Sequence, residues 1–295
     1  MPIKMTTFER HSITPWLLLA PQLAVVAIFF FWPAAESVRQ AFYVQDAFGL
    51  GERFVGLANF QHVLTSPGYW HAFGVTALFS LLVAAGAMGL ALLLAVLADR
   101  VLHGAKLYRV LLTWPYAVAP AVAGLLWLFM FDPVLGVLTH ALAVFGVHWD
   151  AQLDPGQALA LVVIASIWQQ MSYNFVFFLA GLQMIPASLL EAAAIDGAGP
   201  FRRFFGITLP LLSPTAFFLL VMNSVYVLFE TFATIDNTTL GGPGGATRTL
   251  VYKLYEDGFV GRDLGGSSAQ SVLLMVLVGV LTFIQFRYLE RKVAY

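Results

Sequence analysis

The sequence predicts an all-α polytopic membrane protein with six transmembrane helices. Hydrophobic residues make up 60% of the 295 positions and charged residues only 11%, whereas a soluble domain has about 25% charged residues. Six long apolar segments follow one another along the chain, and each is long enough to cross a hydrocarbon core about 30 Å thick. Because the number of spans is even, both termini are expected on the same side of the membrane.

The predicted spans lie at residues 13–35, 72–98, 110–131, 157–182, 212–236 and 266–286. The first is longer than a signal-peptide core and has no small-residue cleavage site at its end, so we expect it to be retained. The second contains Gly74, Gly86 and Gly89, which suit close helix packing. The third is interrupted by Pro115 and Pro120.

The connecting segments fall into two groups by their content of basic residues. One group holds ten Lys and Arg residues in 61 positions, and the other holds five in 90 positions. Basic residues mark the cytoplasmic side of a membrane, so the first group is predicted to be cytoplasmic: residues 1–12, 99–109, 183–211 and 287–295. Residues 36–71 are then an outer loop, in which Asn59 is predicted to cap a short amphipathic helix.

The predicted cytoplasmic segment 183–211 contains two short helices. Ser188 and Glu191 have the spacing of a capping box, which predicts that the first helix starts at Ser188. Gly197 is placed to end it in a left-handed conformation, and Pro200 fits the first turn of the second helix. A helix this short is marginal alone in water, so we expect it to be docked on a partner or to lie on the membrane surface.

Motifs for catalysis, metal binding and nucleotide binding are absent from the sequence. There is no Gly-x-x-x-x-Gly-Lys-Ser/Thr phosphate loop, no Gly-x-Ser-x-Gly turn, and no metal-ligand spacing among the six histidines. The net charge of −1 does not support nucleic-acid binding, and the lack of cysteine excludes disulfides. We therefore predict no catalytic residue, no metal and no cofactor bound by this chain, which argues against an intramembrane enzyme.

Polar side chains interrupt the fourth and fifth spans. Polar groups are costly in hydrocarbon and usually face the bundle interior or a water-filled cavity. The candidates to line a translocation pathway are Gln170, Tyr173, Asn174, Asn223, Tyr226 and Glu230. An equally open interpretation is that they form hydrogen bonds between helices. Glu230 is the strongest pathway candidate, because an ionisable group needs a partner or water.

The segment 183–211 resembles the EAA loop of ABC-importer permeases. The similarity is carried by Glu191-Ala192-Ala193, Asp196-Gly197-Ala198, Ile207, Leu209-Pro210 and Pro214. The resemblance implies a type I ABC-importer transmembrane domain in a bacterial inner membrane, with a cytoplasmic coupling helix in a cleft of an ATPase subunit. The residues implied in coupling are Glu191, Ala192, Ala193, Asp196, Gly197 and Ala198.

Residues 114–121, 170–175 and 286–288 are similar to permease subunits of bacterial sn-glycerol-3-phosphate importers. This narrower resemblance implies sn-glycerol-3-phosphate and glycerophosphodiesters as cargo, and a sugar or disaccharide permease is the alternative. It also implies a second homologous permease, two ATP-binding subunits that use the ATP, and a periplasmic substrate-binding protein. A secondary transporter is the competing class, and it would show internal repeats, broken half-helices or paired membrane charges, none of which the sequence indicates.

Overall fold

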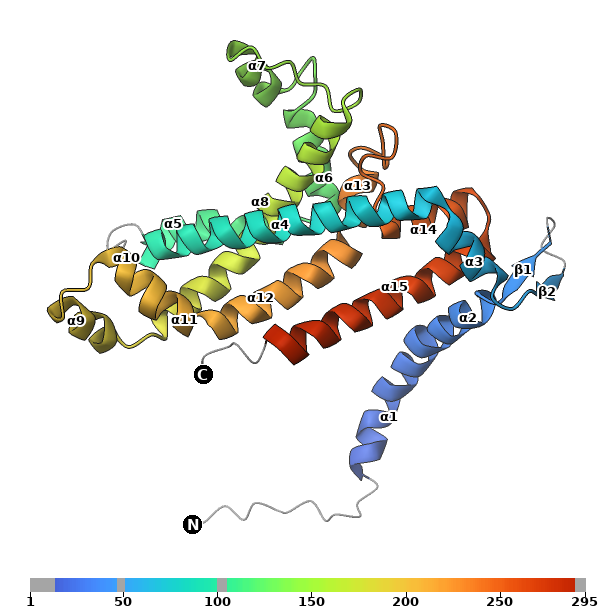
Figure 1. Cartoon of the computed structure of the whole chain (residues 1–295), viewed down its shortest axis with the longest axis horizontal. Coiled ribbons are helices and arrows are strands. Elements are labelled where there is room, and N and C mark those ends of the chain that lie inside the picture. The colour runs from blue at the N-terminus through green and yellow to red at the C-terminus, as the bar shows by residue number, and fades with distance from the viewer. Residues whose placement is uncertain (1–13, 47–50, 100–104, 290–295) are drawn as a thin grey trace. The chain divides into compact units, whose positions relative to one another are not determined.

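The computed structural model describes residues 14–46, 51–99 and 105–289, which are almost entirely helical (Figure 1). The chain divides into two compact units, Met1–Val63 with Asp257–Leu273, and Leu64–Glu256 with Leu274–Tyr295. Among the described residues, five helical runs are long and apolar enough to cross a membrane: Trp16–Gln40, Pro67–Asp99, Pro155–Gln183, Ser213–Glu230 and Leu264–Arg287. A bent pair of shorter helices provides a sixth.

The first helical run of the smaller unit is longer than the predicted span. It is made of α1, η1 and α2, at Thr14–Val26, Ala27–Phe31 and Trp32–Gln40. Pro33 lies in the first turn of α2, where its missing N–H is tolerated, so the helix continues to Gln40 instead of ending near residue 35. The surface of this run is apolar, as suits a lipid-facing helix.

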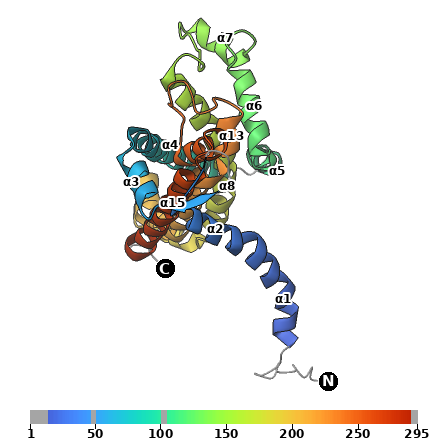
Figure 2. The ribbon, with the colours of Figure 1, turned by 90° about the vertical axis from the view of Figure 1, so that its right-hand side faces the viewer.

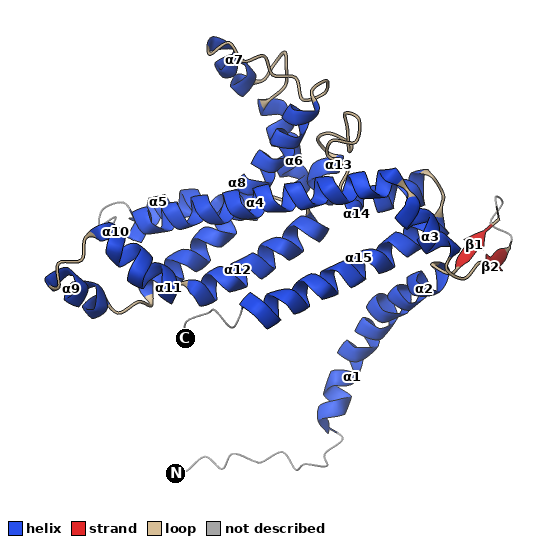
Figure 3. Ribbon diagram, viewed as in Figure 1, coloured by secondary structure: helices blue, strands red, loops and turns tan. Residues whose placement is uncertain are grey.

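A short hairpin follows α2, in a region predicted to be an outer loop with one short helix. Strands β1 (Tyr43–Gln45) and β2 (Glu52–Phe54) pair antiparallel, with Tyr43 opposite Phe54 (Figure 3). Arg39 of α2 contacts the Glu52 carboxylate at 2.7 Å. Its hydrogen bond to Glu52 is also the main reason that the pKa of this carboxyl is lowered.

The predicted cap at Asn59 is wrong. Helix α3 spans Ala58–Thr65, so Asn59 lies inside its first turn. Its buried side-chain amide instead donates to the backbone carbonyls of Ala41 and Tyr43, at 2.9 Å each. Asn59 therefore holds the end of α2 and the start of the hairpin together, a long-range contact that local spacing does not reveal.

The larger unit is built on two long helices that pack side by side, α4 (Pro67–Asp99) and α8 (Pro155–Gln183) (Figures 1 and 2). The buried face of α4 carries Ala87, Ala91 and Ala95 at four-residue intervals. Small side chains at this spacing form a flat stripe that lets the helix backbones approach closely. A predicted packing glycine, Gly86, contacts Ile167 of α8, whereas Gly74 and Gly89 face open space.

The predicted third span is interrupted, as expected from its prolines, and the two helices on either side of the break are bent by 104°. The elements are α5 (Ala105–Thr113), η2 (Trp114–Ala117) and α6 (Pro120–Met130). Pro120 disfavours a helical conformation at the residue before it, and Ala119 accordingly has an extended ψ of 139°. The Gln169 side chain of α8 donates to the Val118 carbonyl at 2.7 Å, which satisfies a backbone group freed by the break.

The remaining segments that are predicted to be outer loops also carry short helices. Asp154 caps α8 by accepting the Gln157 N–H, and α7 spans Val137–Val144. Asp132 accepts the N–H groups of Leu135 and Val134, which lowers its carboxyl pKa. The C-terminal half contains α12, η4, α13, α14, η5, α15 and η6, at Ser213–Val225, Tyr226–Glu230, Phe232–Asp236, Leu250–Tyr255, Glu256–Val260, Leu264–Ile284 and Gln285–Leu289.

Candidate functional site

The segment predicted to couple to a partner forms four short helical elements. They are α9, α10, η3 and α11, at Ala187–Ile195, Pro200–Arg203, Phe204–Thr208 and Leu209–Leu211. The predicted capping box is wrong, because α9 begins at Ala187 and has no side-chain cap. Pro186, with φ −60° and ψ 125°, takes the cap position, so Ser188 falls inside the first turn.

The end of α9 is a complete Schellman motif. The Ala198 N–H donates to the Ala193 carbonyl at 2.9 Å, and the Gly197 N–H donates to the Ala194 carbonyl at 3.1 Å. Gly197 has φ +78°, so the predicted left-handed turn is confirmed. Pro200 follows in the first turn of α10, also as predicted. The turn fixes the direction in which α9 projects from the chain.

Helix α9 has no buried residue and packs on α10. Ile195 is 86% exposed and Phe201, at the start of α10, is 82% exposed. Four of the six candidate coupling residues are also exposed: Glu191, Ala192, Asp196 and Gly197. The other two, Ala193 and Ala198, are partly buried. A short helix that has no buried residue within its own chain is typical of an element that docks on a partner.

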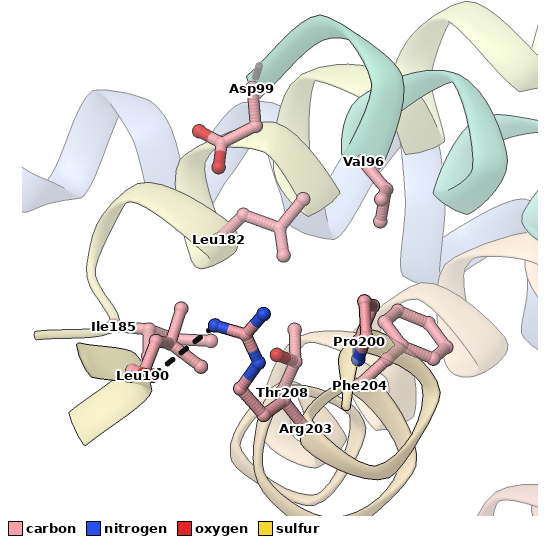
Figure 4. A pocket seen from close by; sticks show the side chains of 9 residues that line it. All are labelled: Val96, Asp99, Leu182, Ile185, Leu190, Pro200, Arg203, Phe204 and Thr208. Atoms are coloured by element: carbon pink, nitrogen blue, oxygen red, sulfur yellow. Dashed lines mark hydrogen bonds between the residues drawn. The ribbon is translucent and has the colours of Figure 1, made fainter. Parts of the chain in front are cut away.

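A cavity of about 140 Å³ lies between this segment and the ends of α4 and α8 (Figure 4). Arg203 of α10 and Asp99, the last residue of α4, supply its charged groups. An Arg203 guanidinium nitrogen, Nη1, donates to the Leu190 carbonyl of α9 at 3.4 Å. The cavity therefore joins the exposed helix α9 to two long membrane helices.

The polar residues of the fourth and fifth spans divide into two groups. Asn174 of α8 and Asn223 of α12 are fully buried, and their side-chain amides donate to each other. Tyr226 is also buried, and its hydroxyl donates to the Gln169 side chain at 3.3 Å. Gln169 thus bridges the bent third span and η4, a role that was not predicted from its position in the fourth span.

The second group consists of Gln170, Tyr173 and Glu230, which differ in how far this chain buries them. Gln170 is buried, but Tyr173 is only partly buried and Glu230 is exposed. The Tyr173 ring lies 5.5 Å from the Tyr116 ring. The structure therefore places Glu230 near Tyr173 and Tyr226, while Asn174 and Asn223 pair with each other.

Among the described residues, no cluster of three or more His, Asp or Glu side chains could hold a metal ion. The functional features of the chain are thus a membrane bundle with a polar centre and an exposed helical segment at one end. These features are typical of a transport component that works with other subunits.

Residues 12–295 match the family described as "Binding-protein-dependent transport system inner membrane component", and this chain belongs to that family. It is therefore a multi-pass permease subunit of the inner membrane, not an enzyme. The predicted all-α polytopic fold is confirmed.

The chain is similar to named relatives along nearly its whole length. It is 58% identical to the sn-glycerol-3-phosphate transport system permease protein UgpA of Brucella suis biovar 1 (strain 1330), over 97% of each chain. It is 57% identical to the protein of the same name from Yersinia pseudotuberculosis serotype I (strain IP32953), over 96% of this chain and 97% of the relative.

A solved structure shares the fold. A chain of a bacterial ABC transporter involved in the import of the acidic polysaccharide alginate matches with a TM-score of 0.81 and 22% identity. The match covers 95% of this chain and 97% of that chain. At this identity the likeness establishes the shared fold and nothing about cargo.

Proposed function

We propose that this chain forms half of the translocation pathway of an ATP-driven importer for sn-glycerol-3-phosphate and glycerophosphodiesters. The cargo assignment rests on sequence identity to sn-glycerol-3-phosphate transport system permeases. This identity is 57% to 58% over nearly the full length of both chains.

The proposed assembly has a second homologous permease, two ATP-binding subunits and a periplasmic substrate-binding protein. The permease itself holds no cofactor, and its partner subunits bind and hydrolyse ATP. Support for the binding protein comes from the family description and from an alginate ABC transporter structure in complex with a substrate-bound periplasmic protein.

The proposed contact with the ATPase is the exposed surface of α9. Its candidate coupling residues project from a turn fixed by Gly197, and the neighbouring side chains Ile195 and Phe201 offer apolar area for docking. Removing such side chains from water is favourable by a transfer free energy of about 25 cal/mol per Å² of apolar surface. We place this surface on the cytoplasmic side, as the distribution of basic residues predicts.

The proposed pathway passes the partly buried Tyr173 and the exposed Glu230, with the buried Tyr226 beside them. Hydroxyl and amide groups offer hydrogen bonds to a phosphate ester, whereas a carboxylate repels it. Glu230 is therefore proposed as a gate residue rather than a cargo ligand. Gln170 lies in the same helix as Tyr173 and is kept as a pathway residue. Asn174 and Asn223 are proposed to hold α8 against α12.

The test is uptake by the whole importer, reconstituted in proteoliposomes with its partners, internal ATP and the binding protein. Labelled sn-glycerol-3-phosphate should accumulate, excess unlabelled glycerophosphodiester should compete, and maltose should not. Accumulation of a sugar without sn-glycerol-3-phosphate uptake would overturn the cargo assignment. Uptake by the permease alone under an ion gradient would instead indicate a secondary transporter.

A further inference from the structure

Arg203 occupies a position between the exposed helix α9 and the membrane helix α4. It is the last residue of α10, and its guanidinium points into the cavity at the base of this segment (Figure 4). From there it donates to the Leu190 carbonyl in the middle of α9. Arg203 is thus a direct link between the proposed docking helix and the cavity wall.

The hydrogen bonding of Arg203 is incomplete. A guanidinium has five N–H donors, and its contact with Leu190 is long, at 3.4 Å. The Arg203 Nε atom is buried and has no hydrogen-bond partner. Leaving a buried donor unpaired costs free energy, and for charged groups the cost is larger. This arrangement favours any movement that brings an acceptor to the guanidinium.

The carboxylate of Asp99 faces the same cavity from the opposite side. Asp99 ends α4, and Leu182 of α8 lies between it and Arg203 (Figure 4). Within the part of the chain that the structure describes, no ion pair joins Asp99 to Arg203. Two opposite charges therefore line one cavity of about 140 Å³, with Asp99 exposed and Arg203 half-buried.

We propose that Asp99 and Arg203 form an ion pair that closes this cavity at one stage of the transport cycle. Arg203 then acts as a positioning residue that transmits movement of α9 to α4. The planar guanidinium suits this task because it can hold the Leu190 carbonyl and a carboxylate at once. Since α4 packs along most of α8, a shift at Asp99 reaches the membrane core. The proposal rests on the proposed role of α9 in docking the ATPase.

The first test uses charge reversal in the complete importer, with uptake and binding-protein-stimulated ATP hydrolysis as readouts. Asp99→Lys and Arg203→Glu should each reduce uptake by about 2- to 30-fold, the range of single-residue effects on coupling. The double variant Asp99→Lys/Arg203→Glu should recover at least part of this loss. The matched control is Arg202→Glu, because Arg202 is exposed and does not line the cavity.

A second test detects the closure itself. The chain contains no cysteine, so Asp99→Cys/Arg203→Cys introduces a single defined pair. Disulfide formation should be at least several-fold faster in one of two states, nucleotide-free or trapped with ATP and orthovanadate. The cross-linked importer should lose uptake and regain it on reduction. An equal rate in both states would overturn the proposal.

The ion pair and the docking role of α9 fail through different outcomes. If the reversed double variant is no better than the single ones while Gly197→Val abolishes uptake, the ion pair is wrong and the docking role of α9 stands. If Gly197→Val transports normally, the docking role itself fails. If Arg202→Glu reduces uptake as much as Arg203→Glu does, the charge reversals act through general surface charge. This result would also overturn the proposed ion pair.

Discussion

The side-chain amides of Asn174 and Asn223 donate to each other at 3.2 and 2.8 Å, which joins α8 to α12 inside the bundle. Asn223 also donates to the Leu219 carbonyl of its own helix, at 2.7 Å. Both amides are fully buried and have their hydrogen bonds made within the protein. This geometry suits a structural contact between helices better than a site that binds passing cargo.

Asn174→Leu should lower the thermal stability of the importer in detergent. The change leaves the Asn223 amide without its partner, and interhelical hydrogen bonds in membranes are worth about 0.6 kcal/mol on average and up to about 1.7. The double variant Asn174→Leu/Asn223→Leu should cost less than the sum of the two single changes, because it leaves no orphaned amide. A normal melting temperature with lost uptake would instead place the pair in the pathway.

Features set by nearby residues could be predicted from the sequence. The turn at Gly197 follows from one glycine placed after a helix and before Pro200, and the structure has it with φ +78°. The apolar runs predicted the spans, because a membrane requires long helices whatever they pack against. The exposed helix α9 was likewise predicted from its short length and its position between two apolar segments.

Features set by distant residues could not be predicted. Arg39 contacts Glu52 of the hairpin, 13 positions away, and the role of Asn59 depends on carbonyls 16 and 18 positions away. Pro115 and Pro120 predicted an interruption, but not the bend of 104°. The proximity of Asp99 to Arg203 could not be predicted, because 104 positions separate them in the sequence. Only the packing of the helices brings both residues to one cavity.

Single cysteines should report the predicted sidedness, because the chain has none of its own. Ser188→Cys lies on exposed α9. Val144→Cys ends α7, which is predicted to lie outside, and the native Val144 side chain is 83% exposed. A membrane-impermeant maleimide should label Val144→Cys in intact cells and Ser188→Cys only after permeabilisation. Labelling of both in intact cells would be inconsistent with a cytoplasmic α9.

Glu230→Gln and Glu230→Leu should both lower uptake by the reconstituted importer, and the Leu change should lower it more. Glu230 is exposed in this chain and lies near Tyr173 and Tyr226, two residues of the proposed pathway. The matched control is Asp154→Asn, which removes a carboxylate outside the spans and keeps a capping side chain for α8. Wild-type uptake by both Glu230 variants would remove this residue from the pathway.

Gly197→Val should insert normally into the membrane yet fail to support uptake. A side chain at this position meets no atom within 4 Å, so its cost comes from the backbone conformation alone. A β-branched residue held at φ +78° costs about 1–3 kcal/mol, and the turn relaxes by shifting α9. A change in the direction of α9 should weaken docking more than folding, because none of the residues of α9 is buried within this chain.

The matched control for this prediction is Gly199→Val, two residues further along the same turn. A side chain there also meets nothing within 4 Å, but φ is −64° and ψ is 167°, which valine adopts readily before a proline. Gly199→Val should therefore transport normally, and Gly206→Val, in the helical segment η3, should show a mild defect. The amount of ATPase subunit that co-purifies with each variant separates lost docking from lost transport. Equal uptake by Gly197→Val and Gly199→Val would mean that the direction of α9 is not what couples this permease to ATP hydrolysis.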